Sequence, residues 1–193
     1  MDSCQPKGNT KEWIQTYEGR KLDLLDLDSL IITIEEIAHV LSMKCRFNGH
    51  CQSFYSIAEH SIHISDLCPN NCREWGLLHD ASEAYLPDLQ TPLKRLPEFE
   101  WFVKLEKELL LRIAKHFYLP PTIPGRVKEL DTYMLHVEKN QLMKPMQDPR
   151  DEWGSSVMHP SFVEKPIAKG LQLLTPHQAK RKFKARAKEL SLS

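Results

Sequence analysis

The sequence has no net charge and no long apolar run, and these two absences exclude several classes of protein. Its 26 lysine and arginine residues balance 26 aspartate and glutamate residues, so overall charge gives no argument for binding nucleic acid or a membrane surface. The apolar runs are far too short to span a bilayer, and the first residues lack the apolar region of a signal peptide. We therefore expect a cytoplasmic protein without a membrane partner.

The chain also lacks the paired cysteine motifs of structural zinc sites. Its five cysteines are scattered, and an odd count without a signal peptide favours reduced thiols. Cys68 and Cys72 are separated by Pro-Asn-Asn, which is typical of a loop, and no second Cys/His pair has zinc-like spacing. We therefore expect no zinc finger.

Internal repeats and low-complexity tracts are missing, and strand signals are weak except for a short strand or hairpin within residues 11–30. Pro, Gly and Asn mark the turns, and most segments between them have helical periodicity. The sequence predicts an all-α fold in one domain, long enough for a substantial core. Residues 1–30 form an N-terminal extension, residues 31–142 the core, and residues 143–193 an irregular segment followed by a basic helix.

Capping residues and prolines place the expected helices. Thr33 followed by two glutamates predicts a helix start, and Thr175 followed by Pro176 predicts another. The expected helices cover roughly residues 34–44, 53–66, 73–85, 97–117 and 124–142, and a last one begins at 176.

Residues 77–83, Leu-Leu-His-Asp-Ala-Ser-Glu, stand out from this ordinary pattern. They contain the adjacent pair His79 and Asp80, with His60 upstream and Asp131 downstream, each in an expected helix. Such mixed nitrogen and oxygen ligands suit a six-coordinate divalent cation better than a closed zinc site. Each residue alone would be explained as an ordinary core or capping residue. Together, on inward helix faces, they predict a metal site between helices, because buried carboxylates need a compensating cation.

Further candidates follow from what such a site would do. A metal held by four side chains leaves positions for water and a phosphate oxygen. Glu83, one turn beyond the His-Asp pair, is placed to act as a general acid or base. Arg46 carries a fork-shaped guanidinium that suits phosphate, and His50 and Lys94 are weaker phosphate candidates. Asp88 could bond a sugar hydroxyl or act on the leaving oxygen, although a plain surface role fits the last three residues equally well.

These residues resemble the H…HD…D signature of the HD-domain phosphohydrolases, which are all-α metal enzymes, over roughly residues 31–142. The resemblance is greatest to the compact branch that includes bacterial 5′-deoxynucleotidases and small phage deoxynucleoside triphosphate hydrolases. It implies that Glu83 and Asp88 are further catalytic carboxylates and that Arg46 contacts the phosphate. The metal ligands that it implies are His60, His79, Asp80 and Asp131.

The resemblance implies hydrolysis of a nucleotide phosphoester by metal-activated water, with Mn, Co, Mg, Zn, Ni or Fe as the divalent ion. Two reactions fit it: removal of the 5′-phosphate from a deoxynucleoside monophosphate, and release of intact triphosphate from a substrate such as dATP. One departure concerns the nucleotide pocket. Relatives usually place Trp after the arginine, whereas here Phe47, Asn48, Gly49 and His50 follow it, so base and sugar preference stay open.

Two other functions remain in view. Some HD proteins hydrolyse cyclic or alarmone nucleotides, but this chain lacks the extra histidines and acids expected of a dinuclear cyclic-nucleotide site. The chain could also be a non-catalytic, nucleotide-sensing helical domain with a vestigial site. Residues 180–188 form a basic run with Phe183 available for stacking on single-stranded nucleic acid. Such runs are more often solvated helix faces, and we expect no nucleic-acid partner.

The helix expected at residues 97–117 indicates self-association. Trp101, Leu105, Leu109 and Ile113 recur at helical spacing, and further apolar residues lie beside this stripe. One packing partner would not need so wide an apolar face. We therefore expect a homo-oligomer, a dimer or higher.

Overall fold

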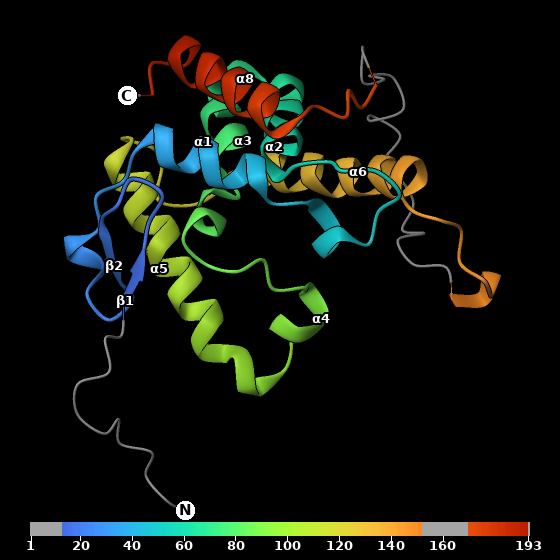
Figure 1. Ribbon diagram of the computed structural model, residues 1–193, viewed down its shortest axis with the longest axis horizontal. Helices are drawn as coiled ribbons and strands as arrows, with labels where there is room; N and C mark the ends of the chain where they lie inside the picture. The colour runs from blue at the N-terminus through green and yellow to red at the C-terminus, as the bar shows by residue number, and fades with distance from the viewer. Residues whose placement is uncertain (1–12, 152–169, 193) are drawn as a thin grey trace, which may run out of the picture.

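The computed structural model describes residues 13–151 and 170–192, and these residues form a mostly helical molecule (Figure 1). The expected all-α fold with a short N-terminal hairpin is confirmed. In the hairpin, β1 (Trp13–Gln15) pairs antiparallel with β2 (Lys21–Asp23). The helices are α1 (Ile34–Met43), α2 (Ile57–Leu67), α3 (Arg73–Leu78), α4 (Thr91–Lys94), α5 (Glu100–His116), α6 (Gly125–Leu142) and α8 (Pro176–Glu189). Short 3₁₀ turns join them: η1 (Leu27–Ser29), η2 (Arg46–Gly49), η3 (Asn70–Cys72), η4 (Ala81–Ala84), η5 (Pro97–Phe99) and η6 (Pro149–Asp151).

Helix α2 lies at the centre of the molecule. Nine of its 11 residues are buried, and it contacts α1, α3, α6 and α8 (Figure 1). Polar groups on such a helix need partners inside the protein. Glu59 has them, because its carboxylate accepts hydrogen bonds from three successive backbone amides, those of Gln172, Leu173 and Leu174, at 2.7, 3.1 and 2.7 Å. This carboxylate therefore fastens the segment before α8 to the core.

The predicted caps are present where they were expected. The Thr33 side chain accepts from the amide of Glu36, and Thr175 forms a capping box with Gln178. The helix expected from residue 53 begins instead at Ile57, because Ser56 is its capping residue.

The helix expected over residues 73–85 is wrong, since α3 ends at Leu78. His79 Nδ1 donates to the carbonyl oxygen of Gly76 at 2.9 Å. In a continued helix this oxygen would accept from the amide of Asp80, so the side chain competes with the backbone and the helix ends. Asp80 then has φ −100° and ψ 13°, and η4 follows. The His-Asp pair consequently lies at a bend between two short helices.

After η4, the observed helices also differ in places from the predicted ones. Helix α5 begins at Glu100, after the η5 turn, and the short helix α4 was not predicted. Helical spacing predicted that Trp101 lies on the core-facing side of the helix. Trp101 is instead 63% exposed, and the neighbouring Phe102 is buried. Residues 152–169 of the predicted irregular segment lie outside the described residues. None of the described helices has the length and apolar character needed to cross a membrane.

Candidate metal centre

The imidazoles of His60 and His79 meet at the centre of the candidate site. His60 lies on α2 and is fully buried, and His79 directly follows α3. Their Nε2 atoms are 3.2 Å apart. Asp131, on α6, places its Oδ1 atom 3.2 Å from His60 Nε2. One donor atom from each of these three residues lies within 4.8 Å of the other two, so the group could hold a metal ion.

The outer nitrogens of both imidazoles are already engaged, and this determines what the inner nitrogens can do. His79 Nδ1 faces the carbonyl oxygen of Gly76, which can only accept, so Nδ1 carries the proton. His60 Nδ1 lies 2.6 Å from a carboxylate oxygen of Glu138 and donates to it in the same way. Two neutral imidazoles would therefore point lone pairs at each other across 3.2 Å. That arrangement needs a positive charge between the two nitrogens, either a proton or a metal ion, and imidazoles oriented by such outer partners are typical metal ligands.

Asp80 borders this group of three residues. Its Oδ2 atom lies 3.3 Å from His79 Nε2 and 3.8 Å from His60 Nε2. Burial would raise the pKa of Asp80, but His79, His60 and Arg46 lower it well below its usual value. Asp80 is therefore an ionised carboxylate at the edge of the donor set, and its role as the fourth ligand stays a prediction.

The described side chains of the site carry a surplus of negative charge. Three ionised carboxylates, those of Asp80, Asp131 and Glu138, face one guanidinium, that of Arg46. With neutral imidazoles this leaves two net negative charges. The same surplus acts on His79, where burial lowers the pKa but the charges of Asp80 and Asp131 raise it to about 9. The site therefore stabilises positive charge at its centre.

Glu138 joins two parts of the site with one carboxylate. It is fully buried on α6. One oxygen accepts from His60 Nδ1 at 2.6 Å, and the other accepts from Arg46 Nη2 at 3.0 Å and from Arg46 Nε at 3.3 Å. The far side of the guanidinium, Nη1, lies 3.6 Å from Asp80 Oδ2. Arg46 is thus held beside the candidate metal ligands in a fixed orientation.

Glu83 is a buried acid beside this group. Its backbone amide donates to the carbonyl of Asp80 at 3.0 Å, and its Oε2 atom is buried without a hydrogen-bond partner among the described residues. Burial, then the charges of Asp80 and Asp88, raise the pKa of Glu83 well above its usual value. Lys44 Nζ donates to the backbone carbonyls of Glu83 and Leu86. The backbone of Glu83 is therefore anchored, whereas its carboxyl group keeps a free oxygen.

The segment after Arg46 forms one rim of the site. Phe47 is half-buried, and the guanidinium carbon of Arg46 lies 5.6 Å from the centre of its ring. Asn48 and His50 are exposed. Asn48, Gly49 and His50 are open to solvent, and contact of this rim with a nucleotide base or sugar stays a prediction.

Asp88 and Lys94 follow Glu83 in the chain, in the loop and in the short helix α4 that come after η4. Asp88 is half-buried and close enough to raise the pKa of Glu83. Lys94 Nζ pairs with Glu106 at 2.7 Å, and its role as a phosphate ligand stays a prediction. A phosphate would have to compete with that carboxylate.

Sequence reasoning missed Glu138 and Lys44. A signal for Glu138 exists, because it follows Asp131 by seven residues, which places both side chains on one face of α6. Lys44 carried no such signal, because its partners are backbone carbonyls 39 and 42 residues away along the chain.

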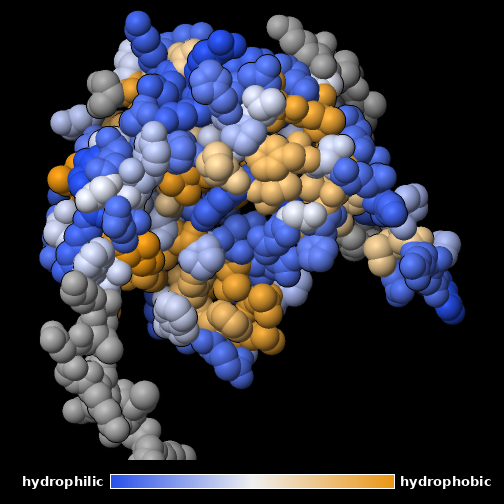
Figure 2. Space-filling model, in the orientation of Figure 1, coloured by the Kyte–Doolittle hydropathy of each residue, from blue (hydrophilic) through white to orange (hydrophobic). Residues whose placement is uncertain are grey.

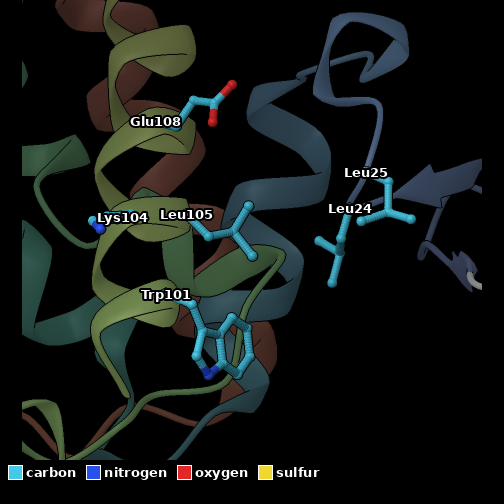
Figure 3. Close-up of a pocket in the computed structure, with 6 residues that line it drawn as sticks. All are labelled: Leu24, Leu25, Trp101, Lys104, Leu105 and Glu108. Carbon is cyan, nitrogen blue, oxygen red and sulfur yellow. The ribbon is translucent and has the colours of Figure 1, made fainter. Parts of the chain in front are cut away.

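The described part of the surface is hollowed in places that differ in character. The face drawn in Figure 2 is hollowed near its centre, between α1 and α4, and hydrophilic side chains gather around this hollow. A second hollow, of about 530 Å³, lies between α5 and the segment after β2 (Figure 3). Its lining is mostly apolar and consists of Leu24, Leu25, Trp101, Lys104, Leu105 and Glu108.

Comparison with known proteins shows bacterial relatives that match most of the chain. It is 37% identical over 131 residues to the uncharacterized protein YfdR of Escherichia coli, an overlap of 67% of this chain and 72% of YfdR. It is 34% identical over 145 residues to the uncharacterized protein RCAP_rcc00048 of Rhodobacter capsulatus, an overlap of 68% and 74%. No family profile matches the sequence. The chain belongs to the family of these two bacterial proteins.

Proposed function

We propose that this protein is an HD-type, divalent-metal-dependent phosphohydrolase that removes the 5′-phosphate from (deoxy)nucleoside monophosphates. The observation that carries the proposal is the meeting of two imidazole Nε2 atoms and one carboxylate within 4.8 Å, with both outer imidazole nitrogens engaged. Water and a phosphate oxygen can reach this group, because the Asp131 side chain is 43% exposed.

His60, His79 and Asp131 would hold the metal, and Asp80 would complete the set. When bound, a divalent ion such as Mn, Co, Mg, Zn, Ni or Fe supplies an activated water and polarises the phosphorus centre. The chain's own residues account for the rest of the reaction.

Arg46 orients the phosphate, because Glu138 holds the guanidinium beside the metal residues. Glu83 holds a proton at its carboxyl group and gives it to the departing 5′-oxygen, a step suited to a buried, unpartnered acid. Asp88 bonds the sugar, and the exposed rim of residues 47–50 contacts the base.

The available cations favour a monophosphate over a triphosphate. Two further phosphates would bring additional negative charge, which needs lysine or arginine partners. Lys94 is engaged by Glu106, and Lys44 by two backbone carbonyls. Arg46 is paired with Glu138 as well, but its Nη1 atom lies 3.6 Å from Asp80, which places this cation beside the residues that would hold the metal.

The experiment is product analysis after metal exchange. Metal is removed with a chelator, Mn or Co is restored, and nucleoside mono- and triphosphates of each base are offered. We expect nucleoside and single phosphate from monophosphates. Intact triphosphate as product would reassign the substrate, and turnover of cyclic or alarmone nucleotides alone would favour that other class.

A matched pair of variants separates an enzyme from a nucleotide sensor. Asp131→Asn should lose metal binding and turnover together, whereas Glu129→Gln, an exposed acid on the same helix, should change neither. If wild-type protein binds metal and nucleotide but turns over none of the panel, the sensor function replaces the enzymatic one.

We also propose that the protein is a homodimer that pairs through the apolar hollow beside α5. Trp101 is 63% exposed and Leu25 is 82% exposed at this hollow, and contiguous exposed apolar surface often marks an interface. Lys104 and Glu108 lie one turn apart on its border. Two antiparallel copies of α5 would place the lysine of one copy against the glutamate of the other.

A further inference from the structure

Two half-buried cysteines lie close together at the base of the segment that carries Arg46. The Sγ atoms of Cys45 and Cys51 are 3.4 Å apart. The other two cysteines in the described residues, Cys68 and Cys72, are buried in a different part of the core. A disulfide bond needs the two sulfur atoms at about 2.05 Å, so a small side-chain movement would join the first pair.

The backbone between these cysteines is in an unusual conformation. Phe47 and Asn48 have φ angles of 54° and 49°, and Gly49 has a φ angle of 83°. Left-handed conformations are costly for residues with a side chain, above all for a bulky one, and persist only where the surroundings enforce them. Here the ends of the segment are fastened, since Arg46 N donates to Tyr55 O at 2.9 Å and Gln52 N donates to Leu142 O at 2.7 Å.

We propose that Cys45 and Cys51 are a redox modification site, in which a peroxide converts the two thiols into a reversible disulfide across the base of this segment. The sulfur of Cys45 attacks the peroxide, its S–O bond forms as the O–O bond breaks, and the departing oxygen leaves as water. The sulfur of Cys51 then attacks the sulfenic acid, the S–S bond forms, and the hydroxyl group leaves with the second thiol proton as a second water. Two thiols are oxidised and one peroxide is reduced.

The environment assigns different roles to the two thiols. Burial, then the neighbouring Cys45, raise the pKa of Cys51 to about 11, so Cys51 stays protonated at neutral pH. Because the thiolate is the attacking form, this shift disfavours Cys51 as the sulfur that first attacks the peroxide. We therefore assign the first attack to Cys45 and the second step to Cys51, whose proton leaves with the hydroxyl group, the two sulfur atoms lying 3.4 Å apart.

The disulfide would fix both ends of the segment that presents Arg46, Phe47 and Asn48 to the candidate site. Its effect on substrate rests on the proposed function, in which Arg46 contacts the phosphate. Formation of the disulfide does not rest on the proposed function, because it is inferred from the positions of the two cysteines.

The test is oxidation of the full-length protein by hydrogen peroxide in the presence of a metal chelator and without substrate. After the peroxide is removed, the protein is unfolded, its remaining thiols are alkylated, and it is digested with trypsin. Cleavage after Arg46, the single tryptic site between the two cysteines, separates them, and fragmentation of peptide 47–73 distinguishes Cys51 from Cys68 and Cys72, which the same peptide carries. The expected product is two peptides joined through Cys45 and Cys51, and dithiothreitol should restore alkylation of both.

Matched variants complete the design. Cys68→Ser, which removes a buried thiol elsewhere, should retain the cross-link. Cys51→Ser should lose it and leave Cys45 as a sulfenic or higher acid. The proposal is wrong if peroxide leaves both thiols alkylatable, joins either to another cysteine, or yields only sulfinic and sulfonic acids in the wild-type protein. None of these results depends on hydrolysis, so they stand apart from failure of the proposed function.

Discussion

Glu138 is the residue that joins a candidate metal ligand, His60, to Arg46. It is fully buried, and its two oxygens are divided between His60 and Arg46. A carboxylate in that position fixes the tautomer of the imidazole and makes its other nitrogen a better ligand. It also keeps a buried guanidinium from being left unpaired, which would be costly.

Replacement Glu138→Gln should therefore weaken metal binding by about 10- to 100-fold, the usual cost of losing such an outer partner. The measurement is isothermal titration of chelator-treated protein with Mn or Zn. Glu129→Gln, on the exposed side of the same helix, is the control and should bind as the wild type does. Equal affinities in the Glu138 and Glu129 variants would show that His60 needs no carboxylate partner.

Replacement Glu83→Gln should separate proton transfer from metal binding. The amide keeps the size of the side chain but cannot give up a proton in the reaction, so we expect turnover to fall by about 100-fold or more. Metal affinity should stay close to that of the wild type, because Glu83 lies outside the group that could hold the ion. Steady-state kinetics and metal titration on the same preparation provide both readings. A variant that loses metal as well would assign Glu83 a ligand or folding role.

At the scale of elements, ion pairs tie the N-terminal helix α1 to the C-terminal helix α8. Glu35 on α1 pairs with Lys180 and Lys184 on α8, each at 2.5 Å. Phe183, fully buried between these lysines in the sequence, anchors the same helix in the core. Hydrogen bonds from Lys180 and Lys184 lower the pKa of Glu35 from 4.5 to about 2. The basic run of α8 therefore serves packing at least in part.

This pairing predicts a pH-dependent contribution to stability. A lowered folded-state pKa gives stability that is full above pH 4.5 and is lost as pH falls toward 2. Because Glu35 is 35% exposed, solvent screening limits the contribution to about 1 kcal/mol or less. Glu35→Gln should therefore lower the melting temperature at pH 7 by a few degrees and match the wild type near pH 2. A gap of constant size across this range would mean that the charge of Glu35 contributes nothing.

At the scale of the whole molecule, the described residues leave the apolar hollow beside α5 open to solvent. Trp101, expected in the core, instead lies at its edge (Figure 3). A second copy of the chain would bury this aromatic surface, and large aromatic side chains dominate the energetics of interfaces.

Sedimentation velocity at micromolar concentration tests the dimer. We expect the wild type to sediment as a dimer and Trp101→Asp as a monomer. Tyr118→Asp is the matched control, because Tyr118 is also an exposed aromatic residue, at 96%, but does not line the hollow. A monomeric wild type would contradict the proposed dimer. A dimeric Trp101 variant would show that the interface lies elsewhere on the molecule.

Local signals in the sequence were sufficient for much of the fold. Capping residues and apolar periodicity located α1, α6 and α8 closely, because helix ends are decided by contacts within a few residues. The break after α3 was missed, since it depends on the rotamer of His79 and its bond to Gly76. The burial of Trp101 was predicted wrongly, because periodicity identifies the apolar face of a helix but does not show which face packs against a neighbouring element.

The sequence by itself determined an all-α chain and the chemical types of the donors, because helical periodicity and residue identity are local properties. Only the tertiary structure decided which donors meet. Arg46 and Glu138 are 92 residues apart and His60 and Glu138 are 78 apart, and no local pattern records such a pairing. Their contact results from the packing of α2 against α6, which brings one buried carboxylate between a histidine and an arginine. The physical reason is that buried ionised groups are not hydrated by water, so they are stable only when they pair with each other inside the core.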